Sequence, residues 1–290
     1  MSFLIDLTVS GLAIGALYGL IAMGFAVIYK ATGLVNFAQG EMTMIVAYLA
    51  WTIATTLTGN VFVVVAGAVI GAAVLGLAIE RIVMRPMLGE PLFAGVMVTV
   101  ALAVILRSSI TFIWDAYPHA LDLGVGRDVL RAGGLSLRGA QVAAIVTLLG
   151  LLAGFYVFFR FSKFGIAMRA VAADDRAALL MGVSAARIHA LAWAASSVIA
   201  GIGGVLFAMV YDLSPAMFAL GLKGFPATIL GGLDSVLGSG VAGLIIGVTE
   251  NLAGGYLTPG MKDIAGFLMI IVVLMVRPFG LFGEREIVRV

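Results

Sequence analysis

The chain has no cysteine, only two histidines among its 290 residues, and few charges, since Lys, Arg, Asp and Glu together make up 11%. Without cysteine there can be no disulfides and no thiolate metal sites. A soluble domain has about 25% charged residues, because water must solvate its surface. A hydrophobic content of 62% in long apolar runs instead indicates a chain that lies in a lipid bilayer. The net charge of +2, without a run of Lys and Arg, gives no sign of nucleic-acid binding.

The signature motifs of common hydrolases are also missing. No GxxxxGK[ST] occurs, so the chain has no P-loop with which to hydrolyse ATP. It has no HExxH or GxSxG either, and His119 and His189 are far apart in the sequence. We therefore expect no catalytic residue, no metal site and no cofactor bound by this chain itself.

Apolar runs predict an all-α, polytopic transmembrane bundle that forms a single domain over 1–290. A helix needs roughly 20 apolar residues to cross the hydrocarbon core. The segment 224–252 is interrupted by ILGGLDSVLGSG, so it is either one bent span or a short re-entrant helix followed by a full span. We expect about eight to nine spans, with broken or re-entrant helices, in the runs 9–29, 42–58, 61–80, 92–112, 139–159, 190–211, 224–252 and 263–280.

Basic residues predict the orientation, because cytoplasmic loops are rich in Lys and Arg. The loop 161–189 is strongly basic and is expected in the cytoplasm, as is a C-terminus that carries Arg277, Arg285 and Arg289. The loop 113–138 balances its arginines with aspartates and is expected outside. The N-terminal segment lacks early basic residues, so we expect a retained first span that starts outside.

Glycines spaced four residues apart predict close helix contacts, because small residues let helix backbones approach in lipid. They are Gly11, Gly15 and Gly19, then the pairs Gly67 and Gly71, Gly150 and Gly154, and Gly243 and Gly247. The two halves are also loosely alike. Each has a glycine-rich span followed by a polar or broken segment, LVNFAQGEM in the first half and 212–235 in the second, which would form inverted repeats if the two spans run in opposite directions.

A few polar residues fall near or within the predicted spans, where a charge is costly unless it is paired or hydrated. The candidates for a solute path or gate are Asn36, Gln39, Glu41 and Asp234. The segment from Asn36 to Glu41 could equally be a hydrogen-bonded helix break. Arg107 and Glu250 are more typical of helix interfaces, and Arg107 could extend towards the membrane surface.

The segment FSKFGIAMRAVAADDRAALLMGVSAARIHALAW, residues 161–193, is too polar to span the membrane and too long for a tight turn. Residues 166–181 can form one or two short helices, which Gly182 would end because glycine tolerates a left-handed backbone. A small-residue helix flanked by charges suits docking in a groove of another protein.

Within this loop, RAALLMG at 176–182 resembles the EAA-x3-G loop by which permeases of ABC importers engage their ATPases, with Arg176 in place of the leading glutamate. GIAMRA at 165–170, AGIGGVL at 200–206 and GLAIGALYGLIAMGFAVIYKATGLVNFAQGEM near the start are similar to the LivH-type branched-chain amino acid permease family. The likeness runs over almost the whole chain. It implies that the ATPase-coupling residues are Gly165, Arg169, Asp174, Arg176, Ala177, Ala178 and Gly182.

The resemblance implies the membrane-spanning subunit of an ABC importer in a bacterial inner membrane. Its partners would be a second, related permease, two cytoplasmic ATPase subunits that use the ATP, a soluble binding protein and the membrane lipid. The implied solute is a branched-chain amino acid, urea, a short amide or an aromatic acid, moved by alternating access. The alternative is a stand-alone secondary transporter driven by ions, with Asp234 as its titratable group. A third possibility is a structural membrane scaffold, which would transport no solute.

Overall fold

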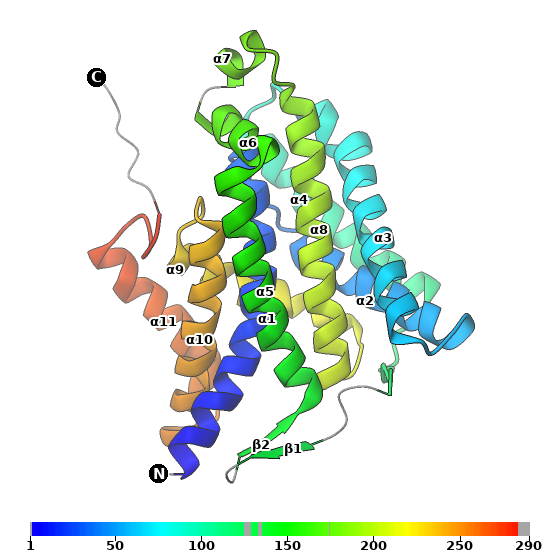
Figure 1. The fold of residues 1–290 in the computed structure, drawn as a ribbon, viewed down its shortest axis with the longest axis vertical. Helices are drawn as coiled ribbons and strands as arrows, with labels where there is room; N and C mark the ends of the chain where they lie inside the picture. Colours follow the sequence, from blue (N-terminus) through cyan, green and yellow to red (C-terminus); the bar gives the residue numbers. More distant parts are fainter. Residues whose placement is uncertain (1, 125–128, 133–134, 174, 284–290) are drawn as a thin grey trace.

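The computed structural model describes residues 2–124, 129–132, 135–173 and 175–283, which form a bundle of helices (Figure 1). Asp174, Arg285 and Arg289 lie outside the described residues, as does part of the loop 113–138. The helices are α1 (Ser2–Thr32), α2 (Gln39–Thr56), α3 (Val61–Ile79), α4 (Leu92–Ile113), α5 (Gly139–Phe161), α6 (Lys163–Ala173), α7 (Asp175–Leu180), α8 (Ala185–Val210), α9 (Ala219–Gly231), α10 (Val236–Tyr256) and α11 (Met261–Val276).

Shorter elements complete the bundle. A π-helical turn, Glu80–Met84, and a 3-10 turn, Arg85–Met87, extend α3, and a 3-10 turn, Pro215–Phe218, leads into α9. The loop between α4 and α5 contains an antiparallel hairpin of β1 (Val129–Ala132) and β2 (Leu135–Arg138), which pairs Val129 with Arg138. The all-α prediction is confirmed apart from this hairpin.

Six helices of the described chain are long and apolar enough to cross a membrane: α1, α3 with its extension to Met87, α4, α5, α8 and α10. Three others are shorter or more polar. Helix α2 has 18 residues and begins with Gln39 and Glu41, α9 has 13 residues and α11 has 16. The predicted run 224–252 is split by residues 232–235 into α9 and α10, so of the two alternatives the structure shows a short helix followed by a full span and not one bent span.

The bundle has two ends, which we name by their loops (Figure 1). The α6–α7 end also holds the turn between α9 and α10, where Lys30 at the end of α1 donates a hydrogen bond to the backbone oxygen of Asp234 at 2.8 Å. The hairpin end holds β1 and β2, and there Arg138 donates to the backbone oxygen of Val210 at 3.1 Å. The start of α1 lies at the hairpin end (Figure 1).

The segments α1–α2 and α8–α9 repeat one arrangement, a long helix followed by a break and a shorter helix, in opposite directions. Helices α1 and α8 pack antiparallel, with the Ser196 hydroxyl donating to the Gly24 carbonyl at 2.8 Å. After α1 the chain turns back into the bundle through residues 33–38 and continues as α2. After α8 it does the same through residues 211–218 and continues as α9. We call α2 and α9 the half-helices. The half-helices α2 and α9 meet near their starts, where a Cβ on Gly221 would lie 2.8 Å from the Gly40 Cα.

From this junction the half-helices run to opposite ends of the bundle. Helix α2 runs to the hairpin end, where the Trp114 indole at the end of α4 donates to the Thr52 hydroxyl at 2.7 Å. Helix α9 runs to the α6–α7 end and its turn into α10. The inverted relation expected from the sequence is therefore present in the structure.

Helix α1 is the centre of the bundle, since 89% of its apolar window is buried, against 11% for α5. Its glycines contact α10 directly: a Cβ on Gly15 would lie 2.7 Å from the Gly243 carbonyl and 2.8 Å from the Leu244 Cα. The predicted close packing is thus confirmed for these helices. Gly150 and Gly154 on α5 have no atom of the described chain within 4 Å of an added Cβ, so their spacing brings no such contact here.

This difference predicts the effect of larger side chains. Gly243→Leu should abolish most of the folded protein, because the new side chain would meet the backbone of Gly19 and Gly15 rather than a flexible neighbour. Gly150→Leu, in open space on α5, should leave the yield near that of the wild type. The monodisperse fraction after detergent extraction, measured by size-exclusion chromatography, checks this. Equal yields of the two variants would contradict the packing argument.

Candidate functional site

The break between α1 and α2 is held by a buried polar network. Asn36 donates to the Gln39 side-chain oxygen at 3.0 Å, and its own oxygen accepts from the Ala38 amide at 3.0 Å, which closes a tight turn. Gln39 donates to the Ser196 hydroxyl on α8 at 3.1 Å. All of these side chains are fully buried, so Asn36 and Gln39 fasten the re-entrant segment to α8.

Glu41, two residues farther along, reaches a different partner. Its carboxylate pairs with Arg107 on α4, and the guanidinium lies over the Phe218 ring, 3.4 Å from the ring centroid. The Glu41 side chain is 3% exposed and that of Arg107 is 40% exposed. The structure therefore joins both re-entrant segments and α4 at one ion pair. Its cation lies at an exposed edge.

A second charged cluster joins α1, α9, α10 and α11, and sequence reasoning missed its central residue, Lys223. The Lys223 ammonium lies 3.0 Å from a carboxylate oxygen of the buried Glu250 and 3.1 Å from one of Asp263. Tyr18 donates to the other Glu250 oxygen at 3.2 Å. The only signal in the sequence was a single lysine directly before an apolar run.

Asp234 is not close to the other predicted path residues. It lies in the turn between α9 and α10 at the α6–α7 end, where its backbone accepts from Lys30. Asn36, Gln39 and Glu41 lie at the start of α2, inside the bundle. The structure thus divides the predicted set into a group of three at the junction and one residue at an end.

The predicted coupling loop forms two short helices, α6 and α7, that protrude from their end of the bundle (Figure 1). Gly165 permits the tight turn from α5, since a Cβ there would lie 2.8 Å from the Phe159 Cα. Helix α7 ends at Leu180, and Gly182, two residues later, has a φ of 83°. The Val183 amide donates a hydrogen bond back to the Ala178 carbonyl at 2.9 Å. The prediction that Gly182 ends the helix is confirmed.

The other predicted coupling residues differ in what they expose. Ala178 is only 5% exposed and packs in the core with Met168, whereas Ala177 and Arg169 are exposed. For Arg176 only the backbone, within α7, is described. Sequence reasoning missed three highly exposed apolar side chains of this loop, which are 64%, 88% and 84% exposed: Leu179, Leu180 and Met181.

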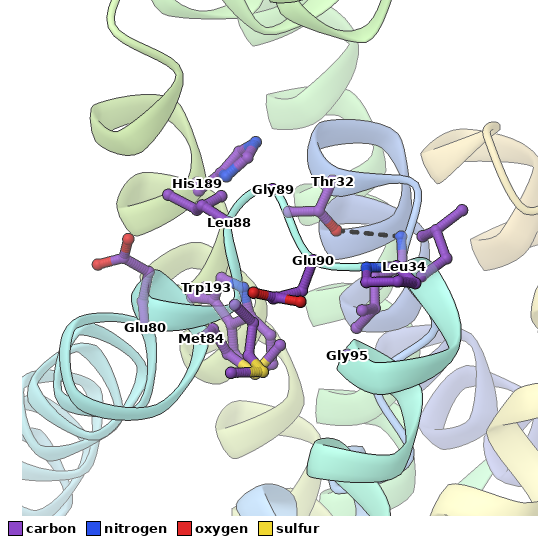
Figure 2. Close-up of a pocket in the computed structure, with 13 residues that line it drawn as sticks. Thr32, Leu34, Glu80, Met84, Leu88, Gly89, Glu90, Gly95, His189 and Trp193 are labelled. Atoms are coloured by element: carbon purple, nitrogen blue, oxygen red, sulfur yellow. Dashed lines mark hydrogen bonds between the residues drawn. The ribbon is translucent and has the colours of Figure 1, made fainter.

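A cavity of about 240 Å³ lies at the same end, between the end of α1, the turn from α3 to α4, and the start of α8 (Figure 2). Its polar side chains are those of Thr32, Glu80, Glu90 and His189, and Trp193 forms part of its wall. Glu80 is ion-paired with Arg85 at 2.9 Å. None of the four predicted path residues lines this cavity, so it is separate from the junction of the half-helices.

The fold and the junction define the class of protein. Half-helices that meet inside a multi-pass bundle, with ionisable groups beside the junction, are typical of membrane transport proteins.

Comparison with known sequences gives the family. The family described as branched-chain amino acid transport system / permease component matches residues 7–274. The high-affinity branched-chain amino acid transport system permease protein LivH of Escherichia coli strain K12 is 32% identical over 97% of this chain and 96% of the relative. The high-affinity branched-chain amino acid transport system permease protein BraD of Pseudomonas aeruginosa is 30% identical over 97% of this chain and 96% of the relative. The chain belongs to the branched-chain amino acid permease family.

Proposed function

We propose that the chain is the membrane-spanning permease subunit of an ATP-binding cassette importer that moves a branched-chain amino acid, or a related small polar solute, by alternating access. The observation that carries the proposal is the protruding α6–α7 loop, whose tip exposes Leu180 and Met181 on a short helix ended by Gly182. An exposed apolar helix fits a groove on another protein. That protein would be one of two cytoplasmic ATPase subunits, which bind and hydrolyse the ATP.

A continuous path of contacts can carry movement from this loop to the junction. Helix α8 begins five residues after α7 ends. Eleven residues into α8, Ser196 bonds to Gln39 at the start of α2 and to the carbonyl of Gly24 on α1. A displacement of α7 by its ATPase would thus move α8, and with it the re-entrant segment.

The orientation follows from the basic residues. Lys30, Arg85, Arg160 and Arg277 all lie in or beside elements of the α6–α7 end, which we assign to the cytoplasm of a bacterial inner membrane. The start of α1 and the β-hairpin then lie outside, where a soluble binding protein would deliver the solute. A second, related permease would complete the transport pathway.

Reconstituted transport tests the proposal against the ion-driven alternative. Proteoliposomes that hold the chain with its partner permease, both ATPase subunits and the loaded binding protein should take up radiolabelled leucine only when ATP is present. The chain alone should take up none under a proton or sodium gradient. Uptake by the lone chain would instead support a secondary transporter, and no uptake in either case would support a scaffold.

A further inference from the structure

The Glu41–Arg107 pair lies at the edge of an apolar surface made by both re-entrant segments. Phe218, Leu222 and Phe225 follow one another at i, i+4 and i+7 on the continuous helical stretch 215–231, so they form one stripe. Phe218 lies under the Arg107 guanidinium at one end of the stripe. At the other end Phe225 contacts Phe37, with ring centroids 5.8 Å apart. We call this surface, with the ion pair, the re-entrant wall.

The re-entrant wall is unsuited to lipid. Arg107 is 40% exposed, and an arginine facing hydrocarbon well inside a membrane costs several kcal/mol. Phe37 is also exposed and belongs to the irregular backbone between α1 and α2. Irregular backbone at membrane depth occurs where it is buried in protein or lines a water-filled cavity. In the assembled importer the re-entrant wall would therefore line the transport cavity.

The groups on the wall match a zwitterion with an apolar side chain. The Arg107 guanidinium uses Nη2 for Glu41, and its Nε is buried without a partner in the described chain, so a solute would reach the guanidinium through its exposed edge. A guanidinium binds a carboxylate with two parallel hydrogen bonds. Glu41 can accept an ammonium group in exchange for Arg107, and the stripe around Leu222 can pack against an alkyl group.

We propose that the Glu41–Arg107 pair binds the zwitterionic head group of the solute during transport, with Arg107 on its carboxylate and Glu41 on its ammonium. The two charges of the pair are then exchanged for the two charges of the solute, and no charge is left unpaired in the membrane. This inference rests on the proposed function and narrows its solutes to amino acids, since urea, amides and aromatic acids lack one or both charges.

The first test removes both charges together, so that neither remains unpaired. Glu41→Gln with Arg107→Gln should still assemble with the partner subunits but should take up leucine about ten- to a hundredfold more slowly, as expected for lost charge-assisted hydrogen bonds. The matched control is Glu80→Gln with Arg85→Gln, a pair of similar exposure, 2% and 33%, that lies away from the wall. It should keep wild-type uptake. Wild-type uptake by an assembled Glu41→Gln, Arg107→Gln importer would overturn the proposal.

The second test needs no change in the pair and uses the absence of native cysteine. Leu222→Cys places a thiol on the re-entrant wall, where Leu222 is 59% exposed. The control is Ile105→Cys, because Ile105 is similarly exposed, at 61%, but lies on α4 away from the wall. In the reconstituted importer a charged, water-soluble methanethiosulfonate should label Leu222→Cys much faster, because thiolates form in water and not in lipid. Leucine supplied through the binding protein during ATP turnover should slow that labelling.

The two failures can be told apart. A wild-type importer that takes up neither leucine nor any of the other proposed solutes with ATP contradicts the proposed function. If the wild type transports leucine while Leu222→Cys is labelled no faster than Ile105→Cys, or leucine does not slow its labelling, only the assignment of the re-entrant wall is overturned.

Discussion

Replacing Leu180 and Met181 with aspartate should abolish ATP-driven uptake while the chain still inserts and pairs with its partner permease. Both side chains are more than four-fifths exposed at the tip of α7, so no packing within the chain is lost. Their burial against an ATPase would contribute about 1.5–3 kcal/mol for each side chain, and two buried charges would oppose docking. Copurification of the ATPase subunits should fall at least about tenfold.

Tyr117→Asp is the matched control for this variant. Tyr117 is exposed in the loop at the opposite end of the bundle, so its replacement should leave ATPase copurification unchanged. A charge at Ala178 would be less informative, since Ala178 is buried and its replacement would disturb the packing of the loop itself. Full ATP-driven uptake by the Leu180→Asp, Met181→Asp variant would show that α7 is not the docking element.

Lys223→Met should strongly destabilise the chain. It would leave the buried Glu250 carboxylate with only the Tyr18 hydroxyl, in place of an ammonium at 3.0 Å. Removal of one partner from a buried ion pair costs about 3–5 kcal/mol. Thermal unfolding of the detergent-solubilised protein, followed by tryptophan fluorescence, should show a much lower midpoint.

A second substitution separates charge from shape. Lys223→Met with Glu250→Gln removes both charges and keeps a side chain that can accept from Tyr18, so most of the lost stability should return. Asp263, the other partner of Lys223, is exposed and needs no compensation. If the double variant is as unstable as Lys223→Met, the lysine acts through packing and not through its charge.

Much of the architecture could be predicted from local sequence. The apolar runs located the helices because the length of a span follows from bilayer thickness, and Gly182 located the end of α7 because its backbone is left-handed there. The glycine spacing of α1 correctly indicated a close contact but did not identify the partner. The same spacing on α5 brought no contact, since spacing alone does not determine what lies opposite a helix.

The functional residues were only partly predictable. Glu41 was recognised as unusual, and Arg107 was assigned to an interface, but nothing in the sequence joined two residues 66 positions apart. Lys223 was missed because its partner Glu250 lies on another helix. In the coupling loop the segment was identified, while the burial of Ala178 and the exposure of Leu180 depend on how α7 packs against α6 and α8.

The sequence by itself determined that this chain lies in a membrane, where its helices run and which loop protrudes, because these depend on the composition of neighbouring residues. Only the tertiary structure decided that two half-helices meet at Gly40 and Gly221, and which charges are paired beside that junction. The physical reason is that a buried charge is stabilised by a partner from a different helix, and the packing of the whole bundle selects that partner.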